Sequence, residues 1–141
     1  MLALRTRSLI RELGWPVVTF SGTETVGTAW SDGENEWRAL AAIDDDGTQF
    51  VFYTQARTAV PPARRDAAAR LVARANWGLP TAALELNLET GEARVRCGFD
   101  TGGGEPSVDL LRQTVFANVA AATVYLPALE AVSGGADPEV V

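Results

Sequence analysis

Apolar residues recur with the three-to-four-residue spacing of an amphipathic helix in three stretches of the chain. The first is Leu2–Leu13, and Gly14 is suited to end it. The second is Pro61–Ala75, where two prolines suit the first turn of a helix. The third begins after Ser107, a favourable N-terminal cap, and runs to the Ser-Gly-Gly sequence at 133–135. Three helices are therefore predicted.

Between the helices, apolar and polar residues alternate with the spacing of two that is typical of half-buried strands. Asp-Gly at 46–47 and Thr-Gly at 90–91 favour tight hairpin turns. The predicted strands are a lead-in at Val17–Phe20, then Glu24–Trp30, Glu36–Ile43, Gln49–Thr54, Ala82–Leu88 and Ala93–Phe99. Tight turns imply antiparallel neighbours, so the order α-β-β-β-α-β-β-α predicts an α+β fold with an antiparallel sheet.

The same patterns predict the core and the extent of the domain. The apolar faces of the last two strands contain Leu84, Leu86, Leu88, Val95, Cys97 and Phe99. The last helix has an apolar stripe made of Val108, Leu111, Val115, Val119, Ala122, Leu126 and Leu129. We expect this helix to be buried on more than one side and kinked at Pro127. A single domain is predicted over residues 1–135, with a frayed tail at 136–141.

The amino-acid composition excludes several common kinds of catalytic site. The 141 residues contain neither lysine nor histidine, and all twelve basic residues are arginine. The chain therefore lacks an imidazole base, a Schiff-base lysine and a phosphate-loop lysine. Its one cysteine, Cys97, excludes an intrachain disulfide and a multi-cysteine zinc site. We expect a protein that is not an enzyme and that has no cofactor and no metal site.

The charge is acidic overall and unevenly distributed. A net charge of −6 disfavours direct binding to nucleic acid. Residues 24–46 carry seven acidic side chains and one arginine, whereas residues 57–74 carry five arginines and one aspartate. This segregation either guides a charged partner or leaves two solvated faces. The longest nearly apolar run, Ala120–Leu129, is too short to span a bilayer, and no leader is expected, so we expect a cytoplasmic protein without a membrane partner.

A few polar groups admit both a chemical and a structural interpretation. The Asp-Asp-Asp-Gly sequence at 44–47 lacks the alternating ligands of a calcium loop, and a hairpin turn is favoured. Cys97 is either a reactive thiol or a core residue, and burial favours the core. Arg94 and Arg96 form either an anion clamp or a solvated strand face. The carboxylates available for acid–base chemistry are Glu85, Glu89 and Glu92.

Aromatic residues give the strongest signal for an interaction surface. The four tryptophans exceed what a core of this size needs, and tryptophan is favoured at interfaces. Two of them, Trp30 and Trp37, flank one turn and are expected on one face of the sheet. The candidate residues for a partner or dimer interface are Trp30, Trp37, Phe50, Phe52, Leu71 and Trp77, with the core as the alternative for each.

Three segments resemble a known family. They are Asn76 at the end of the second helix, the hairpin Leu86–Phe99 with its ETGEARVRCGFD run, and VYLPALEAVSGG in the last helix. Over residues 60–135 the chain resembles the YbjN family of bacterial proteins, and the element order is similar to the type III secretion chaperone-like fold of that family. The resemblance implies a homodimeric α+β protein that is not an enzyme. Secretion chaperones of this fold bind an extended, poorly folded segment of a client along apolar grooves, whereas YbjN proteins are described as regulators.

Three functions are compatible with these observations. The first is a dimeric, chaperone-like or adaptor protein that binds another protein through apolar surface on its sheet and helices. Its acidity favours a basic partner, such as a nucleic-acid-binding protein. The second is a regulatory module that senses a small ligand in a pocket. A carboxylate-dependent hydrolase or transferase is a third, and it requires paired carboxylates in a cleft.

Overall fold

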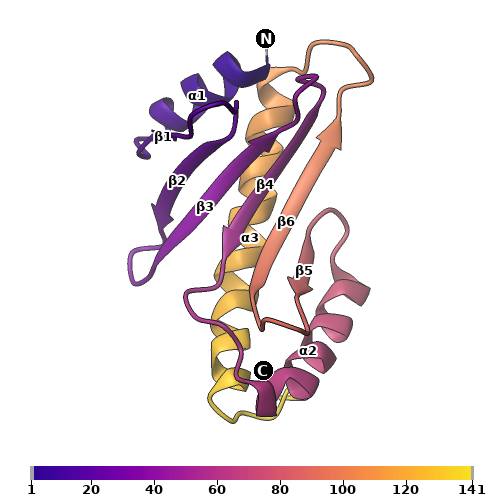
Figure 1. The fold of residues 1–141 in the computed structure, drawn as a ribbon. Coiled ribbons are helices and arrows are strands. Elements are labelled where there is room, and N and C mark those ends of the chain that lie inside the picture. Colours follow the sequence, from indigo (N-terminus) through magenta and orange to yellow (C-terminus); the bar gives the residue numbers. More distant parts are fainter. Residues whose placement is uncertain (1, 141) are drawn as a thin grey trace.

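A six-stranded antiparallel sheet and three α-helices make up the described chain (Figure 1). The computed structural model describes residues 2–140. The predicted α+β fold and element order are confirmed, and the lead-in at 17–20 forms a two-residue edge strand. The elements are α1 (Leu2–Glu12), β1 (Val18–Thr19), β2 (Val26–Ser31), β3 (Glu36–Ile43), β4 (Gln49–Gln55), a 3₁₀ turn (Pro62–Arg64), α2 (Arg65–Gly78), β5 (Ala83–Leu86), β6 (Ala93–Asp100) and α3 (Val108–Ser133).

The strands lie in the order β1-β2-β3-β4-β6-β5, and each neighbouring pair is antiparallel. Tight turns connect β2, β3 and β4, as predicted. The chain then leaves the sheet to form α2 and returns as the edge strand β5, so β6 lies next to β4 (Figure 1). Trp30 and Trp37 are direct cross-strand partners in the β2–β3 hairpin, which confirms that they share a face.

Several boundaries differ from the prediction by a few residues, and two of these differences have a clear local cause. α2 extends past Ala75 to Gly78. Leu79 is the first extended residue, because the residue before a proline, here Pro80, is disfavoured in the helical conformation. β5 ends at Leu86, because the side chain of Asn87 accepts hydrogen bonds from the backbone N–H groups of the following turn.

Two predicted core residues are exposed. Leu88 is 60% exposed, since it lies in the turn after β5 rather than in the strand. Val108 is 45% exposed, since it lies in the first turn of α3 and the buried part of the helix begins at Leu111. The other predicted core positions of β5, β6 and α3 are buried or half-buried.

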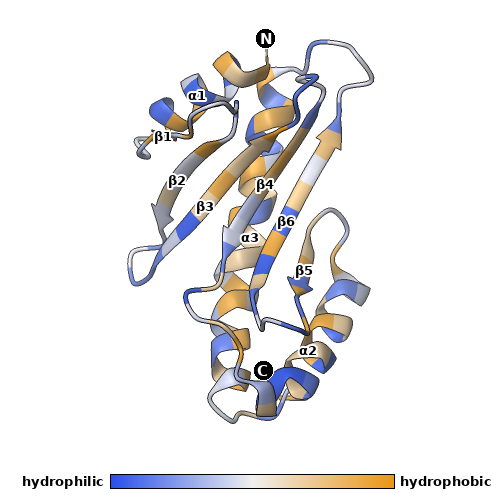
Figure 2. Ribbon diagram, in the orientation of Figure 1, coloured by the Kyte–Doolittle hydropathy of each residue, from blue (hydrophilic) through white to orange (hydrophobic). Residues whose placement is uncertain are grey.

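The core lies on one face of the sheet, between the sheet and α3. Alternate residues of β3 and β4, such as Trp37, Phe50 and Phe52, are fully buried there. α1 packs against α3 and β3 and closes one end of this layer, and α2 packs against α3 and β5 at the other. Apolar segments alternate with polar ones along the strands and along the helices (Figure 2).

α3 is buried on one side only, which corrects the expectation of burial on several sides. Its outer side leaves Phe116 and Val124 at 45% and 61% exposure. The helix is continuous through Pro127. Its 26 residues are long and apolar enough to cross a membrane by length and composition alone, although the central helix of a soluble core passes the same test.

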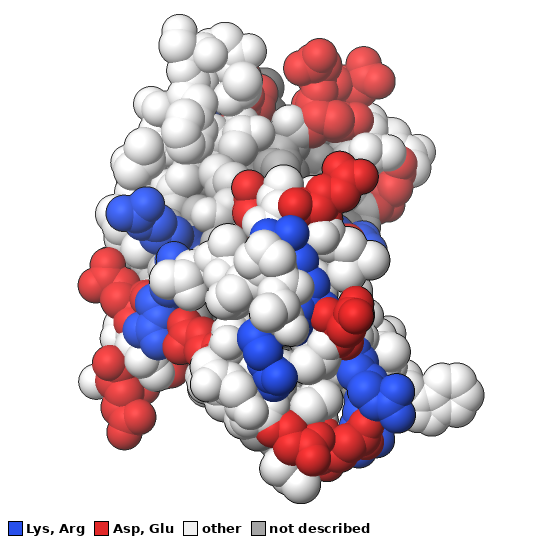
Figure 3. All heavy atoms as spheres, turned by 60° about the horizontal axis from the view of Figure 1, so that its bottom comes forward, with Lys and Arg blue, Asp and Glu red and all other residues white. Residues whose placement is uncertain are grey.

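The segment 134–140 folds back onto α2, and the fraying expected from residue 136 stays a prediction. Arg64 donates from Nε to the Val132 carbonyl and from Nη2 to the Ala136 carbonyl, both at 2.8 Å. Glu139 forms ion pairs with Arg70 and Arg74 of α2. Arginine and carboxylate side chains accordingly lie next to each other at this end of the molecule (Figure 3).

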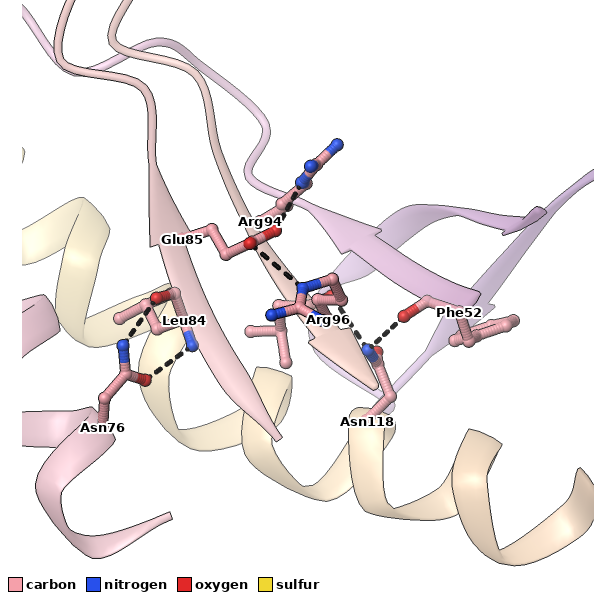
Figure 4. Close-up of polar contacts among 8 residues, drawn as sticks. Phe52, Asn76, Leu84, Glu85, Arg94, Arg96 and Asn118 are labelled. Carbon is pink, nitrogen blue, oxygen red and sulfur yellow. Dashed lines mark hydrogen bonds and ion pairs between the residues drawn. The ribbon is translucent and has the colours of Figure 1, made fainter. Parts of the chain in front are cut away.

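One buried amide joins α3 to the centre of the sheet. Asn118 is fully buried, and its Nδ2 donates to the carbonyls of Phe52 in β4 and Val95 in β6, both at 2.8 Å (Figure 4). Its Oδ1 accepts a 2.6 Å hydrogen bond from the Thr54 hydroxyl, which in turn accepts one from Trp30 Nε1. This network satisfies buried polar groups from four elements and fixes where α3 lies across the sheet.

Replacing this amide should destabilise the fold. Asn118→Ala removes one hydrogen bond from each of two buried carbonyls and from one buried hydroxyl, so we expect a loss of about 2–4 kcal/mol in the free energy of unfolding. The measurement is urea denaturation. Gln113→Ala, at an exposed position of the same helix, is the control and should change stability by less than about 0.5 kcal/mol. Equal effects of the two variants would contradict this role of Asn118.

Candidate functional site

The sheet face opposite α3 has no helix in front of β3, β4 and β6 (Figure 1). We call it the open face and define it by the strand side chains that point away from α3, together with the neighbouring Phe20. One row of the open face crosses all six strands through Val18, Gly27, Leu40, Tyr53, Arg96 and Ala83. A second row contains Ala42, Val51 and Gly98. Because these residues are cross-strand partners, their side chains lie on the same side of the sheet.

Apolar side chains form a strip across β1, β3 and β4. Val18 and Phe20 are exposed, and Leu40, Val51 and Tyr53 are half-buried. A sheet needs only one covered face to fold, so this strip is available for contact.

Two glycines shape the strip. A Cβ at Gly27 would lie 3.2 Å from the ring of Phe20, which covers this residue. A Cβ at Gly98 would lie 2.7 Å from the Phe50 carbonyl oxygen, so only glycine fits between β6 and β4 there. Because Gly98 has no side chain, the surface is recessed beside Val51.

Charged side chains border the strip on β5 and β6. Glu85 accepts hydrogen bonds from Arg94 Nε at 2.8 Å and Arg96 Nε at 3.0 Å (Figure 4). The Arg94 guanidinium also lies 4.1 Å from the centroid of the Tyr53 ring, a cation–π contact. Burial raises the pKa of Glu85, but the hydrogen bonds from Arg94 and Arg96 outweigh it, so this pKa is lowered. Of the two interpretations of Arg94 and Arg96, the anion clamp is therefore closed by an internal carboxylate.

A groove of ≈ 490 Å³ continues the open face where β4 leaves the sheet. It shares Glu85 and Arg94 with the open face, and Ala56 and Ala93 line it as small residues. Arg57, on its other wall, is held by a bidentate ion pair with Glu130 at 2.8 and 2.7 Å. The groove and the strip together form one extended surface with apolar and charged parts.

Five of the six interface candidates are buried inside the chain, which corrects their placement at a surface. Trp30, Trp37, Phe50, Phe52 and Leu71 are each no more than 3% exposed. The alternation predicts which residues share a face, and α3 covers the face with the larger aromatic rings. Only Trp77, at 94% exposure, lies on the surface, and its contact with a partner stays a prediction.

The other singled-out groups have structural roles. Cys97 is buried, and burial raises the pKa of its thiol, which fits a core residue. Asp44 accepts hydrogen bonds from the backbone of Thr48 and Gln49, so its carboxylate closes the predicted hairpin turn. Hydrogen bonds from these backbone groups also lower the pKa of Asp44. Within residues 2–140 no group of three or more acidic or cysteine side chains is placed to hold a metal ion.

Comparison with solved structures defines the class of fold. The ExsC–ExsE complex matches with a TM-score of 0.61 at 8% identity, covering 90% of this chain and 92% of that chain. The HopA1–SchA chaperone–effector complex matches with a TM-score of 0.54 at 11% identity, covering 90% of this chain and 94% of that chain. The fold is therefore that of the type III secretion chaperones.

The family follows from the sequence. The YbjN family model, described as "Putative bacterial sensory transduction regulator", matches residues 7–131, so the chain belongs to the YbjN family. The match includes the N-terminal half, beyond the segment that carried the resemblance. The crystal structure of YbjN from E. coli, "a putative transcription regulator", matches with a TM-score of 0.58 at 14% identity, covering 84% of this chain and 89% of that chain. No curated protein matches the sequence significantly.

The Glu85 cluster should make stability depend on pH. A carboxyl group with a lowered pKa in the folded state stabilises the protein above its unfolded pKa of about 4.3, and this contribution disappears as the pH falls through the folded pKa. We therefore expect Glu85→Gln to lower the urea midpoint at pH 7 and to have little effect at pH 3.

The control for this comparison is Glu92→Gln, at an exposed position of the same hairpin. Among described residues Glu92 has no ion pair within 4.0 Å, so this variant should behave like the parent at both pH values. A destabilisation by Glu85→Gln that is the same at pH 3 and pH 7 would contradict the charge-based explanation.

Proposed function

We propose that this protein is a non-enzymatic, homodimeric binding protein of the cytoplasm that holds a segment of a partner protein on its open face. One observation carries the proposal: helices cover one face of the sheet, and the other face presents the apolar strip of Val18, Phe20, Leu40, Val51 and Tyr53. Contiguous apolar surface on a soluble protein is typical of an interaction site.

The comparisons support the class of partner. Two of the similar structures are complexes between a chaperone-fold protein and a protein partner. The family description, sensory transduction regulation, is also consistent with a protein that acts by binding another protein. A net charge of −6 favours a basic partner, for which acidic residues outside the strip increase the rate of encounter.

The shape of the open face suits an extended segment. Neighbouring strands lie about 4.8 Å apart, so the strip is about 15 Å long from β1 to β4. This is the length of about four or five residues of extended chain. Apolar side chains of the segment would cover Leu40 and Val51. The groove at the end of β4 would then receive the polar part of the segment.

Site-specific photo-crosslinking tests this placement. With p-benzoylphenylalanine at Leu40, irradiation in the native cell should give one crosslinked partner protein, identified by mass spectrometry. The same probe at Leu88, which is 60% exposed but outside the open face, should give much less of it. Adding Val51→Lys should abolish the crosslink in a variant whose circular dichroism is unchanged.

The opposite crosslinking pattern would refute the open face as the binding site. A partner captured at Leu88 and not at Leu40 would place binding elsewhere. A crosslink from Leu40 only to a second copy of the chain would identify this face as a dimer interface.

Self-association is the second part of the proposal, and the outer side of α3 supports it. Residues 113–129 contain no charged side chain. Phe116 and Val124 are exposed there, about 12 Å apart along the helix axis. Two copies of this uncharged side, packed antiparallel, would each cover the apolar surface of the other.

The oligomeric state tests this interface. In sedimentation velocity we expect concentration-dependent dimers of the parent chain at high micromolar concentration. The double variant Phe116→Glu/Val124→Glu should sediment as a monomer, because each interface would bury like charges. Leu4→Glu, which introduces the same charge at an exposed apolar residue outside α3, is the control. A parent chain that stays monomeric would refute the dimer.

The alternative is a regulatory module that senses a small ligand. The observation in its favour is the groove of ≈ 490 Å³, a volume that suits such ligands. Its two arginines are already paired with Glu85 and Glu130, so an anionic ligand would have to displace an internal carboxylate. A thermal-shift screen that stabilises the parent chain but not Arg94→Gln would favour this alternative.

A further inference from the structure

One face of α2 carries a combination of side chains that neither the core nor the open face uses. Arg70, Arg74 and Trp77 follow one another at spacings of four and three residues, so they lie along one side of the helix. All three are exposed. Arginine and tryptophan are the residues most enriched at the energetic centres of protein interfaces.

Trp77 is the most exposed large apolar side chain among the described residues, at 94%. The other three tryptophans are buried or half-buried. A solvated indole at the end of a well-packed helix contributes nothing to the core. It offers a large apolar surface next to two cations, since residues three or four positions apart on a helix are neighbours.

The chain itself shows which chemistry fits this face. The carboxylate of Glu139 lies between the two arginines, with Arg70 Nε at 2.6 Å from Oε1 and Arg74 Nη1 at 2.7 Å from Oε2. Arg64 donates to the Ala136 carbonyl and holds the backbone of the same segment. The face therefore already binds an acidic turn, supplied in cis.

This internal contact is suited to exchange. Arg70 and Arg74 keep 70% and 55% of their side-chain surface exposed, and Glu139 keeps 39%. Ion pairs with this exposure contribute little to stability, and salt weakens them. No side chain of the segment covers the 94% exposed Trp77, so a competing segment with an apolar residue beside its carboxylate gains a contact that Glu139 lacks.

We propose that the Arg70–Arg74–Trp77 face of α2 is a docking site for an acidic segment of a partner protein, whose carboxylate takes the place of Glu139 and whose neighbouring apolar side chain covers Trp77. A second copy of the chain fits less well, because symmetric pairing of two such faces brings arginines toward arginines. The site is separate from the open face, which is proposed to bind its own segment, so either can fail without the other.

Fluorescence anisotropy with a fluorescein-labelled peptide of sequence ELEEL tests the site at low ionic strength. Glu139→Gln should bind this probe about three- to tenfold more tightly than the parent chain, because two exposed ion pairs no longer compete with it. In the Glu139→Gln background, Trp77→Ala should weaken binding at least about threefold, and Arg70→Gln/Arg74→Gln should reduce it to the level of the uncharged peptide QLQQL. Probe binding should also protect Trp77 from acrylamide quenching.

The matched control is Glu12→Gln, which makes the same change in net charge and removes a 2.6 Å ion pair with Arg112 away from α2. It should leave probe affinity at the parent value. An equal gain for Glu12→Gln and Glu139→Gln would overturn the proposal, because the effect would then be one of overall charge. Binding that survives Arg70→Gln/Arg74→Gln, or a dimer of the parent chain that dissociates on Trp77→Ala, would also overturn it.

Discussion

The arrangement of this protein depends on how α3 is fixed across the sheet, and the buried amide of Asn118 is the group that fixes it. Its hydrogen bonds reach β4 and β6 directly and β2 through Thr54 and Trp30. A buried amide must keep its partners, so α3 cannot slide or rotate without leaving polar groups unpaired. With the helix held over one face, the large aromatic rings belong to the core and the opposite face stays open to a partner.

Three surfaces lie outside the core: the open face, the outer side of α3 and the exposed side of α2. They differ in chemistry, so each favours a different kind of partner. The open face combines an apolar strip with a Glu85 carboxylate held by Arg94 and Arg96. The outer side of α3 is apolar and uncharged over residues 113–129, which suits a second copy. The exposed side of α2 pairs two arginines with Trp77. Under the proposals made above, each of these surfaces takes a different partner.

Much of the fold could be predicted from local patterns, because turns, caps and periodicity depend on neighbouring residues. The alternation within β3 puts Trp37 and Leu40 on opposite faces, and that within β4 puts Phe52 and Tyr53 on opposite faces, as the structure has them. It cannot predict which face α3 covers, so the sequence points to the buried rings as interface candidates and not to Leu40, Val51 and Tyr53. The contact of Glu139 with Arg70 spans 69 residues and leaves no local signal in the sequence.

Binding of a partner protein to the open face is tested most directly by a methyl-resolved NMR titration of the isotope-labelled chain with the partner captured by crosslinking. If the partner lies there, the Leu40 and Val51 methyl signals shift or broaden at the lowest partner ratios, while the Leu88 signals, from a residue exposed elsewhere, keep their positions. Unchanged Leu40 and Val51 signals, with shifts confined to residues outside the open face, would contradict it.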